Sequence, residues 1–313
     1  MTVSRRRGFG LVVAGMLALS ACTSQAAPPD PSSSSFTGSS SSPNLPTPTE
    51  TDAAEIIEPV LLFVQAQDRT GYATGNTLLG TEPVGLRGDI AGVQMAFIAP
   101  SLLVPVRDSL MTLGATATDP DTLTPWESMR AALDLDIEGS WTLDRLAFAG
   151  LIDAVGGVFV DVPQAIEVRD EDDQSRMVIR AGRQRLDGIT AADYATFAVP
   201  GEDERDGAVR FRDVWIAVLA RLPESPERLR QILTSLGSLA RTTTDVDTLL
   251  IALSAGRASV LDRSTTEAYV EVQVIRGGDR PASVLSEAGS RTVETMFADF
   301  PLVKPSPEAS VVS

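Results

Sequence analysis

The amino-acid sequence predicts an α/β (α+β) fold in which a mixed central β-sheet is covered by helices within a single domain. Short apolar runs of strand length alternate with longer segments whose apolar residues recur at the helical period, and the two kinds intermix along the chain. Apolar residues make up 43% of the chain, which is enough for a substantial core.

The first expected elements are strands. Residues 60–67 (VLLFVQAQ) form an unbroken apolar run typical of a buried strand, and a second short strand ends near Gly80. Because glycines lie between the two, we expect them to form a hairpin. Residues 92–100 (GVQMAFIAP) predict a third strand, after which Pro100 and Pro105 interrupt the chain.

The next segment predicts helices. Residues 124–127 (TPWE) have the features of a helix start, because threonine can cap, proline suits the first turn and glutamate follows three residues after the cap. A second helix is expected from Leu143, with Leu146 among its regularly spaced apolar residues. Gly156 and Gly157 end this helix, since glycine adopts the left-handed backbone conformation most easily, and residues 158–162 (VFVDV) follow as a strand.

The charged run at residues 169–176 (RDEDDQSR) predicts a solvated hairpin loop. A metal site is the alternative, although its four consecutive acids lack the glycine turn and distal glutamate of a calcium loop. The remaining elements are expected in this order: a strand at 177–182, a helix capped by Thr190, an amphipathic helix over Arg210–Leu222, helices over 226–240 and 246–256, a strand over 267–275 and a final helix over 284–297.

Composition excludes several classes of function. The formal net charge of −16 at pH 7 argues against nucleic acid as a partner, because binding a phosphate backbone requires a basic face. The chain has no histidine, which excludes Ser-His-Asp and Cys-His catalysis and histidine-ligated zinc. Its single cysteine excludes an internal disulfide and a thiolate cluster.

The N-terminal segment has the pattern of an exported lipoprotein. Three arginines (Arg5, Arg6 and Arg7) precede a short apolar run, and Leu19-Ser20-Ala21-Cys22 resembles a bacterial lipobox, in which the cysteine carries a diacylglycerol. The apolar run is too short for a transmembrane helix. We therefore expect residues 1–21 to be a signal peptide, with lipidated Cys22 anchoring the protein to the outer face of the cell membrane.

Two further boundaries follow from composition. Residues 22–52 begin with the lipidated cysteine and are rich in Ser, Pro and Thr, so they predict a disordered linker that cannot bury apolar surface. The globular pattern begins at Ala53, and we expect one domain over residues 53–313.

Three segments together resemble the LytR-CpsA-Psr (LCP) family. Residues 143–170 contain its helix, Gly-Gly turn and strand. Residues 179–198 contain a G-x-x-x-L-[ND]-G-x-x-A-x-x-Y pattern at Gly182, Leu186, Asp187, Gly188, Ala191 and Tyr194. Residues 210–222 (RFRDVWIAVLARL) are similar to the helix that follows in the family. The resemblance covers roughly residues 125–222.

The resemblance implies a fold and an activity. In LCP proteins, helices covering the sheet enclose an apolar tunnel that holds a polyprenyl phosphate, and arginines at its mouth bind the phosphate. The family transfers glycopolymers from this lipid carrier to peptidoglycan or other acceptors, commonly with magnesium. Transfer from a diphosphate requires positive charge on the leaving phosphate, a role suited to arginine and a metal ion.

The candidate site residues match the family only in part. Its R-x-x-R-Q pattern aligns with Arg212-Asp213 and leaves Arg210 one residue out of register; an ion pair with a nearby acid is the alternative role of Arg212. The family's Asp-Thr and Pro-Arg-Asp patterns have no match. The nearest candidates are Asp89, as a possible metal ligand, and Arg107, as a third phosphate contact beside Arg210 and Arg212.

Matched fold motifs beside unmatched arginine and aspartate positions predict a degenerate LCP-like domain. It would be a non-catalytic or accessory module of the cell envelope that binds a polyprenyl-phosphate-type lipid or a cell-wall glycopolymer. The alternative is an active phosphotransferase that attaches glycopolymers to the cell wall, with Mg²⁺ as its cofactor; no other cofactor is expected. Abundant Ala, Gly, Val, Arg and Asp, without histidine, suggest an actinobacterial source.

Overall fold

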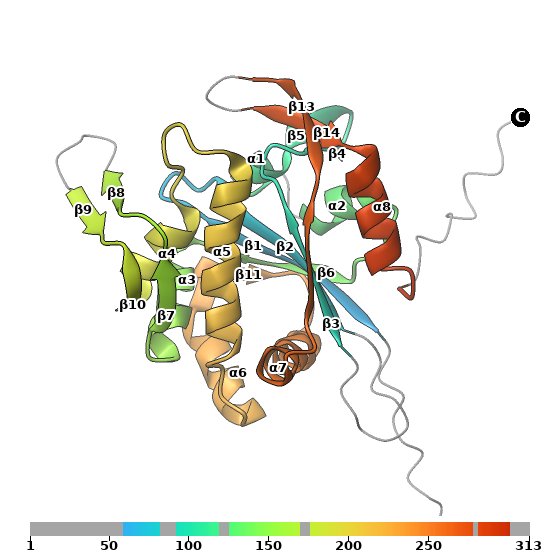
Figure 1. The fold of residues 1–313 in the computed structure, drawn as a ribbon. Helices are drawn as coiled ribbons and strands as arrows, with labels where there is room; N and C mark the ends of the chain where they lie inside the picture. Colours follow the sequence, from blue (N-terminus) through green and yellow to red (C-terminus); the bar gives the residue numbers. More distant parts are fainter. Residues whose placement is uncertain (1–58, 82–91, 119–124, 170–175, 278–280, 301–313) are drawn as a thin grey trace, which may run out of the picture. The chain divides into compact units, whose positions relative to one another are not determined.

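A six-stranded mixed sheet with the strand order β11-β6-β1-β2-β3-β12 lies at the centre of the fold (Figure 1). The computed structural model describes residues 59–81, 92–118, 125–169, 176–277 and 281–300. The strands of the sheet are β1 (Val60–Gln67), β2 (Ala73–Thr81), β3 (Val93–Ile98), β6 (Gly139–Leu143), β11 (Ala240–Thr242) and β12 (Thr266–Val270). This mixed sheet, covered by helices, confirms the predicted fold class.

Helices cover both faces of the sheet (Figure 1). On one face lie α3 (Arg145–Ala154), α4 (Gly188–Thr196), α5 (Glu204–Leu219), α6 (Pro226–Ser235) and α7 (Val246–Asp262). On the other lie α1 (Leu113–Thr116), α2 (Pro125–Leu133) and α8 (Glu287–Met296). Because both faces are covered, β1 is buried along its whole length, which explains its unbroken apolar run.

Smaller elements surround the central layers. Four two-stranded sheets pair β4 (Leu103–Val106) with β5 (Ser109–Thr112), β7 (Val158–Val162) with β10 (Gly182–Leu186), β8 (Ile166–Arg169) with β9 (Arg176–Ile179), and β13 (Val272–Arg276) with β14 (Ala282–Leu285). A short 3₁₀ helix, η1, spans Gly237–Leu239. Among the described residues, no helix has the length and apolar character needed to cross a membrane.

Several local predictions are confirmed. The hairpin of β1 and β2 forms with antiparallel register. Strands β8 and β9, on either side of the charged run, also pair antiparallel, with Arg169 opposite Arg176. The four acids of that run lie outside the described residues. Gly156 and Gly157 both have positive φ, at 83° and 76°, and end α3 as expected.

The strand β6 is the main element that the sequence analysis missed. We expected Leu143 to begin a helix, but it is the last residue of β6, which pairs in parallel with β1. Helix α3 begins at Arg145, after Asp144 caps it by accepting a hydrogen bond from the Ala147 amide. Leu146 is 54% exposed, so its helical spacing does not mark a core position. The short sequence GSWTL becomes a strand because every residue of it is buried against neighbours distant in sequence.

The strand expected over residues 267–275 is divided between two sheets. Its first half is β12 at the edge of the central sheet, and its second half is β13, which pairs with β14. Val274 and Ile275 are more than half exposed, so the second half of the expected strand contributes little to the core. Val284 belongs to β14, and α8 begins only after Ser286, whose hydroxyl caps it.

The starts of two helices differ from those expected. Asp187, not Thr190, caps α4, with its side chain accepting a hydrogen bond from the Thr190 amide at 2.9 Å. Helix α5 begins at Glu204 rather than Arg210, because Asp203 caps it by accepting from the Asp206 amide at 2.9 Å. Thr124, the expected cap of α2, lies outside the described residues.

Aromatic rings fill the layer between α5 and the sheet. Phe211 and Trp215, one helical turn apart on α5, stack with ring centroids 6.2 Å apart. Phe97 of β3 and Trp141 of β6 contact them from the sheet, at 6.3 Å from Phe211 and Trp215 respectively. Phe211 also packs on the backbone of Gly75, where a Cβ atom would lie 2.7 Å from the Phe211 Cγ. The absence of a side chain at Gly75 therefore lets α5 approach the sheet.

We expect Gly75→Ala to lower the free energy of unfolding by about 1–3 kcal/mol, because the added methyl overpacks the contact with Phe211. Denaturant unfolding followed by tryptophan fluorescence measures the change. Gly277→Ala is the matched control, since nothing lies within 4 Å of a Cβ at that position. Equal stability of the two variants would contradict this account of the α5 contact.

Candidate functional site

The carboxyl ends of four strands meet at one edge of the sheet. Strands β1 and β6 are parallel, as are β3 and β12, and β2 is antiparallel to both β1 and β3. In open α/β sheets, ligands bind preferentially at this edge. The segments that follow the strands there are therefore natural positions for polar side chains with a function.

Two arginines at this edge share one buried carboxylate. Arg69 follows β1 and Arg145 follows β6, and both donate to Asp193 of α4, with Nη2–Oδ2 distances of 2.6 Å and 2.9 Å. Asp193 is 1% exposed, whereas Arg69 and Arg145 keep 31% and 19% of their side chains exposed. Burial by itself would raise the pKa of Asp193, but hydrogen bonds from Arg145 and Arg69 outweigh it and hold that pKa below its ordinary value.

Helix α5 presents two different faces because of its helical period. Its core face is buried and carries Ala208, Arg210, Phe211, Val214, Trp215, Val218 and Leu219. Its other face lines a cavity and carries Arg212, Asp213, Ile216 and Ala217, with Ala220 directly after the helix. Arg210 and Arg212, which we expected to act together on a phosphate, therefore belong to different environments.

Arg210 is a buried arginine whose partners are all internal. Its side chain is 5% exposed and forms an ion pair with Glu202. It donates from Nε to the Tyr194 carbonyl at 2.9 Å and from Nη2 to the Phe197 carbonyl at 2.6 Å. These contacts hold the segment between α4 and α5 against α5. The guanidinium of Arg210 is thus occupied by internal partners, and its phosphate-binding role stays a prediction.

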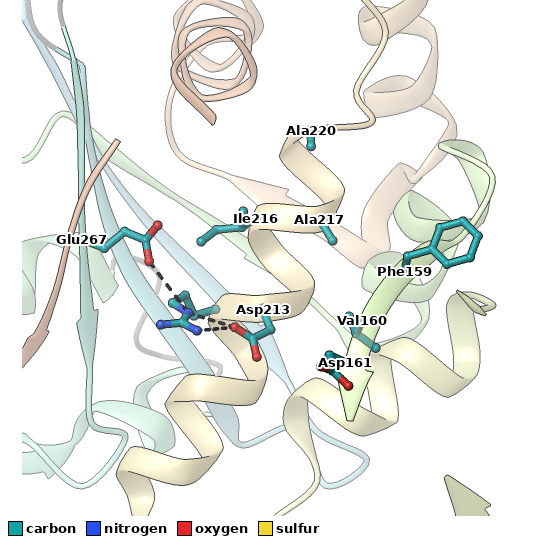
Figure 2. A pocket seen from close by; sticks show the side chains of 9 residues that line it. Phe159, Val160, Asp161, Asp213, Ile216, Ala217, Ala220 and Glu267 are labelled. Carbon is teal, nitrogen blue, oxygen red and sulfur yellow. Dashed lines mark hydrogen bonds and ion pairs between the residues drawn. The ribbon is translucent and has the colours of Figure 1, made fainter. Parts of the chain in front are cut away.

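The cavity beside α5 lies between α5, β7 and β12 and has a volume of about 580 Å³ (Figure 2). One part of its lining is apolar and consists of Phe159, Val160, Ile216, Ala217 and Ala220. The other part is charged and consists of Asp161, Arg212, Asp213 and Glu267. Its volume falls in the range typical of small-molecule sites. We refer to it as the α5 cavity.

Arg212 is paired with carboxylates of the same cavity. It donates to Asp213 Oδ1 from Nε at 2.9 Å and from Nη2 at 2.5 Å, and its Nε lies 3.8 Å from Glu267 Oε2. Its guanidinium also lies over the Tyr269 ring, 5.8 Å from the centroid. Arg212 therefore has the ion-pair role that the sequence analysis kept as its alternative, and its phosphate-binding role stays a prediction.

Burial and neighbouring charges shift the pKa values of this cluster. Burial disfavours the charged form of Arg212, but the hydrogen bond and charge of Asp213 outweigh it, so the pKa of Arg212 is raised. Burial raises the pKa of the Glu267 carboxyl; Arg212 opposes this shift and Asp213 adds to it. Both shifts follow from burying two carboxylates, Asp213 and Glu267, beside one guanidinium.

The remaining predicted site residues lie elsewhere. Arg107 lies in the turn between β4 and β5 with a φ of 52°, and it does not line the α5 cavity. Asp89 and Cys22 lie outside the described residues. The structure thus does not bring Arg107, Arg210 and Arg212 together.

Sequence reasoning missed the acidic side of the α5 cavity and the Arg69–Asp193–Arg145 cluster. A signal for Asp161 was present, because the residues of β7 alternate between buried and exposed and leave Phe159 and Asp161 on its outer face. No local signal marks the cluster, since Asp193 is 124 residues from Arg69 and 48 from Arg145. Within the described ranges, no three acidic or cysteine side chains are grouped so as to hold a metal ion.

We expect Arg210→Ala to lower the free energy of unfolding by about 3–5 kcal/mol, because it leaves Glu202 and two buried carbonyls without their partner. The matched control is Arg212→Ala, whose partly exposed ion pair contributes only about 0–1 kcal/mol. Denaturant unfolding of both variants measures the difference. Equal losses would contradict the assignment of Arg210 as the structural arginine of α5.

Comparison with known proteins identifies a domain and a fold. Residues 125–259 match the LytR_cpsA_psr family. No curated protein matches the chain in sequence.

Several solved structures are similar to this one. TagV of B. subtilis shares 15% sequence identity at a TM-score of 0.61, over 78% of this chain and 98% of that chain. The LytR-Csp2A-Psr enzyme of Actinomyces oris shares 18% at 0.55, over 76% and 89%. The Enterococcus faecalis protein EF0465, described as a transcriptional regulator, shares 17% at 0.58, over 77% and 87%. At these identities the likeness shows the fold. Residues 125–259 therefore match the model of the LytR_cpsA_psr family, and the described part of the chain has the α/β fold of these structures.

Proposed function

We propose that this protein is a cell-envelope lipoprotein whose LytR-CpsA-Psr domain works without transferase activity. It acts as an accessory module in cell-wall glycopolymer assembly and binds a polyprenyl-phosphate-type lipid or the glycopolymer itself. The family domain over residues 125–259 and the fold shared with the A. oris enzyme support the cell-wall setting.

The observation that carries the proposal is the internal pairing of the α5 arginines. Arg210 is enclosed by Glu202 and two carbonyls, and Arg212 is paired with Asp213 and Glu267. Phosphoryl transfer requires cationic groups directed at the charge that develops on the phosphate. Carboxylates that already neutralise these guanidinium groups weaken this stabilisation.

The packing behind α5 also favours an accessory role. In the family, an apolar tunnel between helices and sheet holds the lipid chain, whereas here Phe211 and Trp215 are 1% and 0% exposed and stack against the sheet. A polyprenyl chain entering this layer would have to displace these rings. The phosphate would lie near cations that remain partly exposed, and Arg69 and Arg145 at the carboxyl edge meet this condition.

The described residues do not form a site suited to magnesium, the ion that the family commonly uses. Magnesium prefers octahedral oxygen ligands, usually one or two carboxylates together with substrate phosphates and water. In the α5 cavity, Asp213 and Glu267 already contact Arg212. Asp89, the predicted metal ligand, lies outside the described residues. We therefore derive no catalytic step through a metal ion.

The alternative function is an active transferase of this family that uses Arg107 or Arg212. The side-chain exposure of Arg212, at 31%, and its place in a cavity favour this alternative, because a diphosphate could replace Asp213 or Glu267 as its partner. Membrane attachment through lipidated Cys22 and the linker over residues 22–52 are part of both proposals.

We expect the purified full chain in detergent to show no magnesium-dependent transfer from a polyprenyl-diphosphate-linked glycan to peptidoglycan above a protein-free control. Organic extraction followed by mass spectrometry should recover a co-purified polyprenyl phosphate. A protein that is empty, and stays empty when offered this lipid, would remove the lipid ligand from the proposal. Clear turnover that Arg212→Ala abolishes, with the fold intact, would replace the proposal by the active transferase.

Lipid anchoring is tested through Cys22. Wild-type protein expressed in a bacterium should sediment with the membrane fraction and incorporate labelled palmitate, because a diacylated cysteine anchors firmly. Cys22→Ala should remove the label and prevent processing before residue 22. A variant that still incorporates palmitate would place the lipid on another residue or contradict the lipoprotein assignment.

A further inference from the structure

Two arginines meet at the C-terminal end of α3. Arg185 of β10 donates from Nε to the Gly156 carbonyl at 3.1 Å, and its Nη2 donates to the same oxygen. Arg221, which lies just beyond the end of α5, donates from Nε to the Val155 carbonyl at 3.1 Å. The last carbonyls of a helix carry partial negative charge, which favours cations at this end. These hydrogen bonds hold both side chains at the turn that joins α3 to β7.

The two guanidinium groups lie close together. A Cβ atom at Gly156 would be 3.3 Å from Nη2 of Arg221 and 4.0 Å from Nη2 of Arg185, so these two nitrogens are no farther apart than the sum of the two distances. Within the described ranges, Nη1 and Nη2 of Arg221 and Nη1 of Arg185 have no hydrogen-bond partner. Because guanidinium groups bind oxyanions through such donors, this spacing lets one phosphate or carboxylate group accept from both arginines.

Among the described residues, no carboxylate forms an ion pair with either arginine. Asp153 and Asp187, the acids nearest in sequence to Gly156 and Arg185, accept instead from backbone amides in the first turn of α4, at 2.7 Å and 2.9 Å. Two like charges side by side repel each other, and an anion relieves this repulsion. In a chain with a net charge of −16, this pair is therefore a local site that attracts anions.

An exposed aromatic ring lies beside Arg185. Phe159 of β7 is opposite Arg185 of β10 in the antiparallel register, so both side chains lie on the same face of this two-stranded sheet. Phe159 is 53% exposed, and Figure 2 shows its ring directed away from α5. Farther along the same face Asp161 is opposite Arg183, and these two residues together add no net charge. The face thus joins an apolar ring to the cationic pair at the end of α3.

We propose that Arg185, Arg221 and Phe159 form a binding site for an anionic sugar of a cell-wall glycopolymer. The oxyanion of the sugar, a phosphate or a carboxylate, accepts hydrogen bonds from both arginines. The apolar C–H face of the sugar ring packs on Phe159 and removes that ring from water. The glycopolymer as the source of the sugar rests on the proposed function, whereas recognition of an anionic sugar rests on these three residues.

A membrane surface is the other source of phosphate groups, and the surroundings of the pair disfavour it. Asp153, Asp161 and Asp187 are exposed on the segments that carry or adjoin the two arginines and Phe159. A bilayer of anionic lipids covers a wide area and would bring its headgroups against these carboxylates. A single sugar contacts only the arginine pair and the ring, so it avoids this repulsion.

The test uses the full chain in non-ionic detergent and three soluble probes. Glucose 6-phosphate has both a ring and an oxyanion, glucose lacks the oxyanion, and glycerol 3-phosphate lacks the ring. Titrations followed by saturation-transfer difference NMR measure the dissociation constant of each probe. Glucose 6-phosphate should bind about tenfold or more tighter than glucose, and about threefold tighter than glycerol 3-phosphate.

Variants assign each part of the probe to its residue. The double variant Arg185→Gln/Arg221→Gln should weaken both phosphorylated probes about tenfold, because it removes the cationic pair. Phe159→Ala should weaken glucose 6-phosphate about threefold and leave glycerol 3-phosphate unchanged, since only the sugar ring packs on the phenyl ring. Arg291→Gln is the matched control, because Arg291 is an exposed arginine of α8, on the other side of the central sheet. It should leave both affinities unchanged, and denaturant unfolding verifies that each variant folds.

The proposal is overturned if no phosphorylated probe binds, if glucose binds as tightly as glucose 6-phosphate, or if the double variant binds like wild type. It is equally overturned if Phe159→Ala weakens both phosphorylated probes alike or neither of them. Dihexanoylphosphatidylglycerol, a soluble anionic lipid, should compete no better than glycerol 3-phosphate, and tighter binding would assign the site to a membrane instead. Transferase turnover, or a protein without bound polyprenyl phosphate, would revise the proposed function and leave these outcomes as they are.

Discussion

The candidate site depends on how α5 packs against the central sheet. Phe211 packs where Gly75 has no side chain, and Trp215 stacks on Phe211 and contacts Trp141 of β6. With these rings buried, the helical period directs Arg212, Asp213 and Ile216 toward β7 and β12. The position of the α5 cavity is therefore a consequence of how the opposite face of the same helix packs.

Charge compensation gives neighbouring arginines different roles. Arg210 is enclosed on the core side of α5 and holds the segment that follows α4, so its contribution is structural. Arg212, two residues later, keeps part of its side chain exposed and is balanced by Asp213 and Glu267. A partly exposed pair of this kind is weak and exchangeable, whereas a buried one is not. Of these two arginines, only Arg212 can therefore exchange its partners for a ligand.

The α5 cavity is distinct from the carboxyl edge of the sheet, since none of Arg69, Arg145 and Asp193 lines it. At that edge Asp193 draws Arg69 and Arg145 together, joining the ends of β1 and β6 to α4. At the carboxyl edge, two arginines share one buried carboxylate. In the lining of the α5 cavity, three carboxylates accompany one arginine.

The sequence by itself determined the elements whose signals are local. These are the buried run of β1, the Gly156–Gly157 turn, the strand β7 and the amphipathic helix that forms most of α5. Each follows from spacing within one segment, because helical and strand periods are properties of neighbouring residues. The fold class followed from their order along the chain.

Only the tertiary structure decided the elements and contacts that depend on distant partners. Strand β6 exists because GSWTL lies against β1, and the segment after Thr266 divides because its two halves pair with different strands. The burial of Arg210, the balance of charge around Arg212 and the sharing of Asp193 are likewise set by side chains far away in sequence. A residue type specifies what a side chain can bind, but packing decides which partner it meets and how much water remains around it.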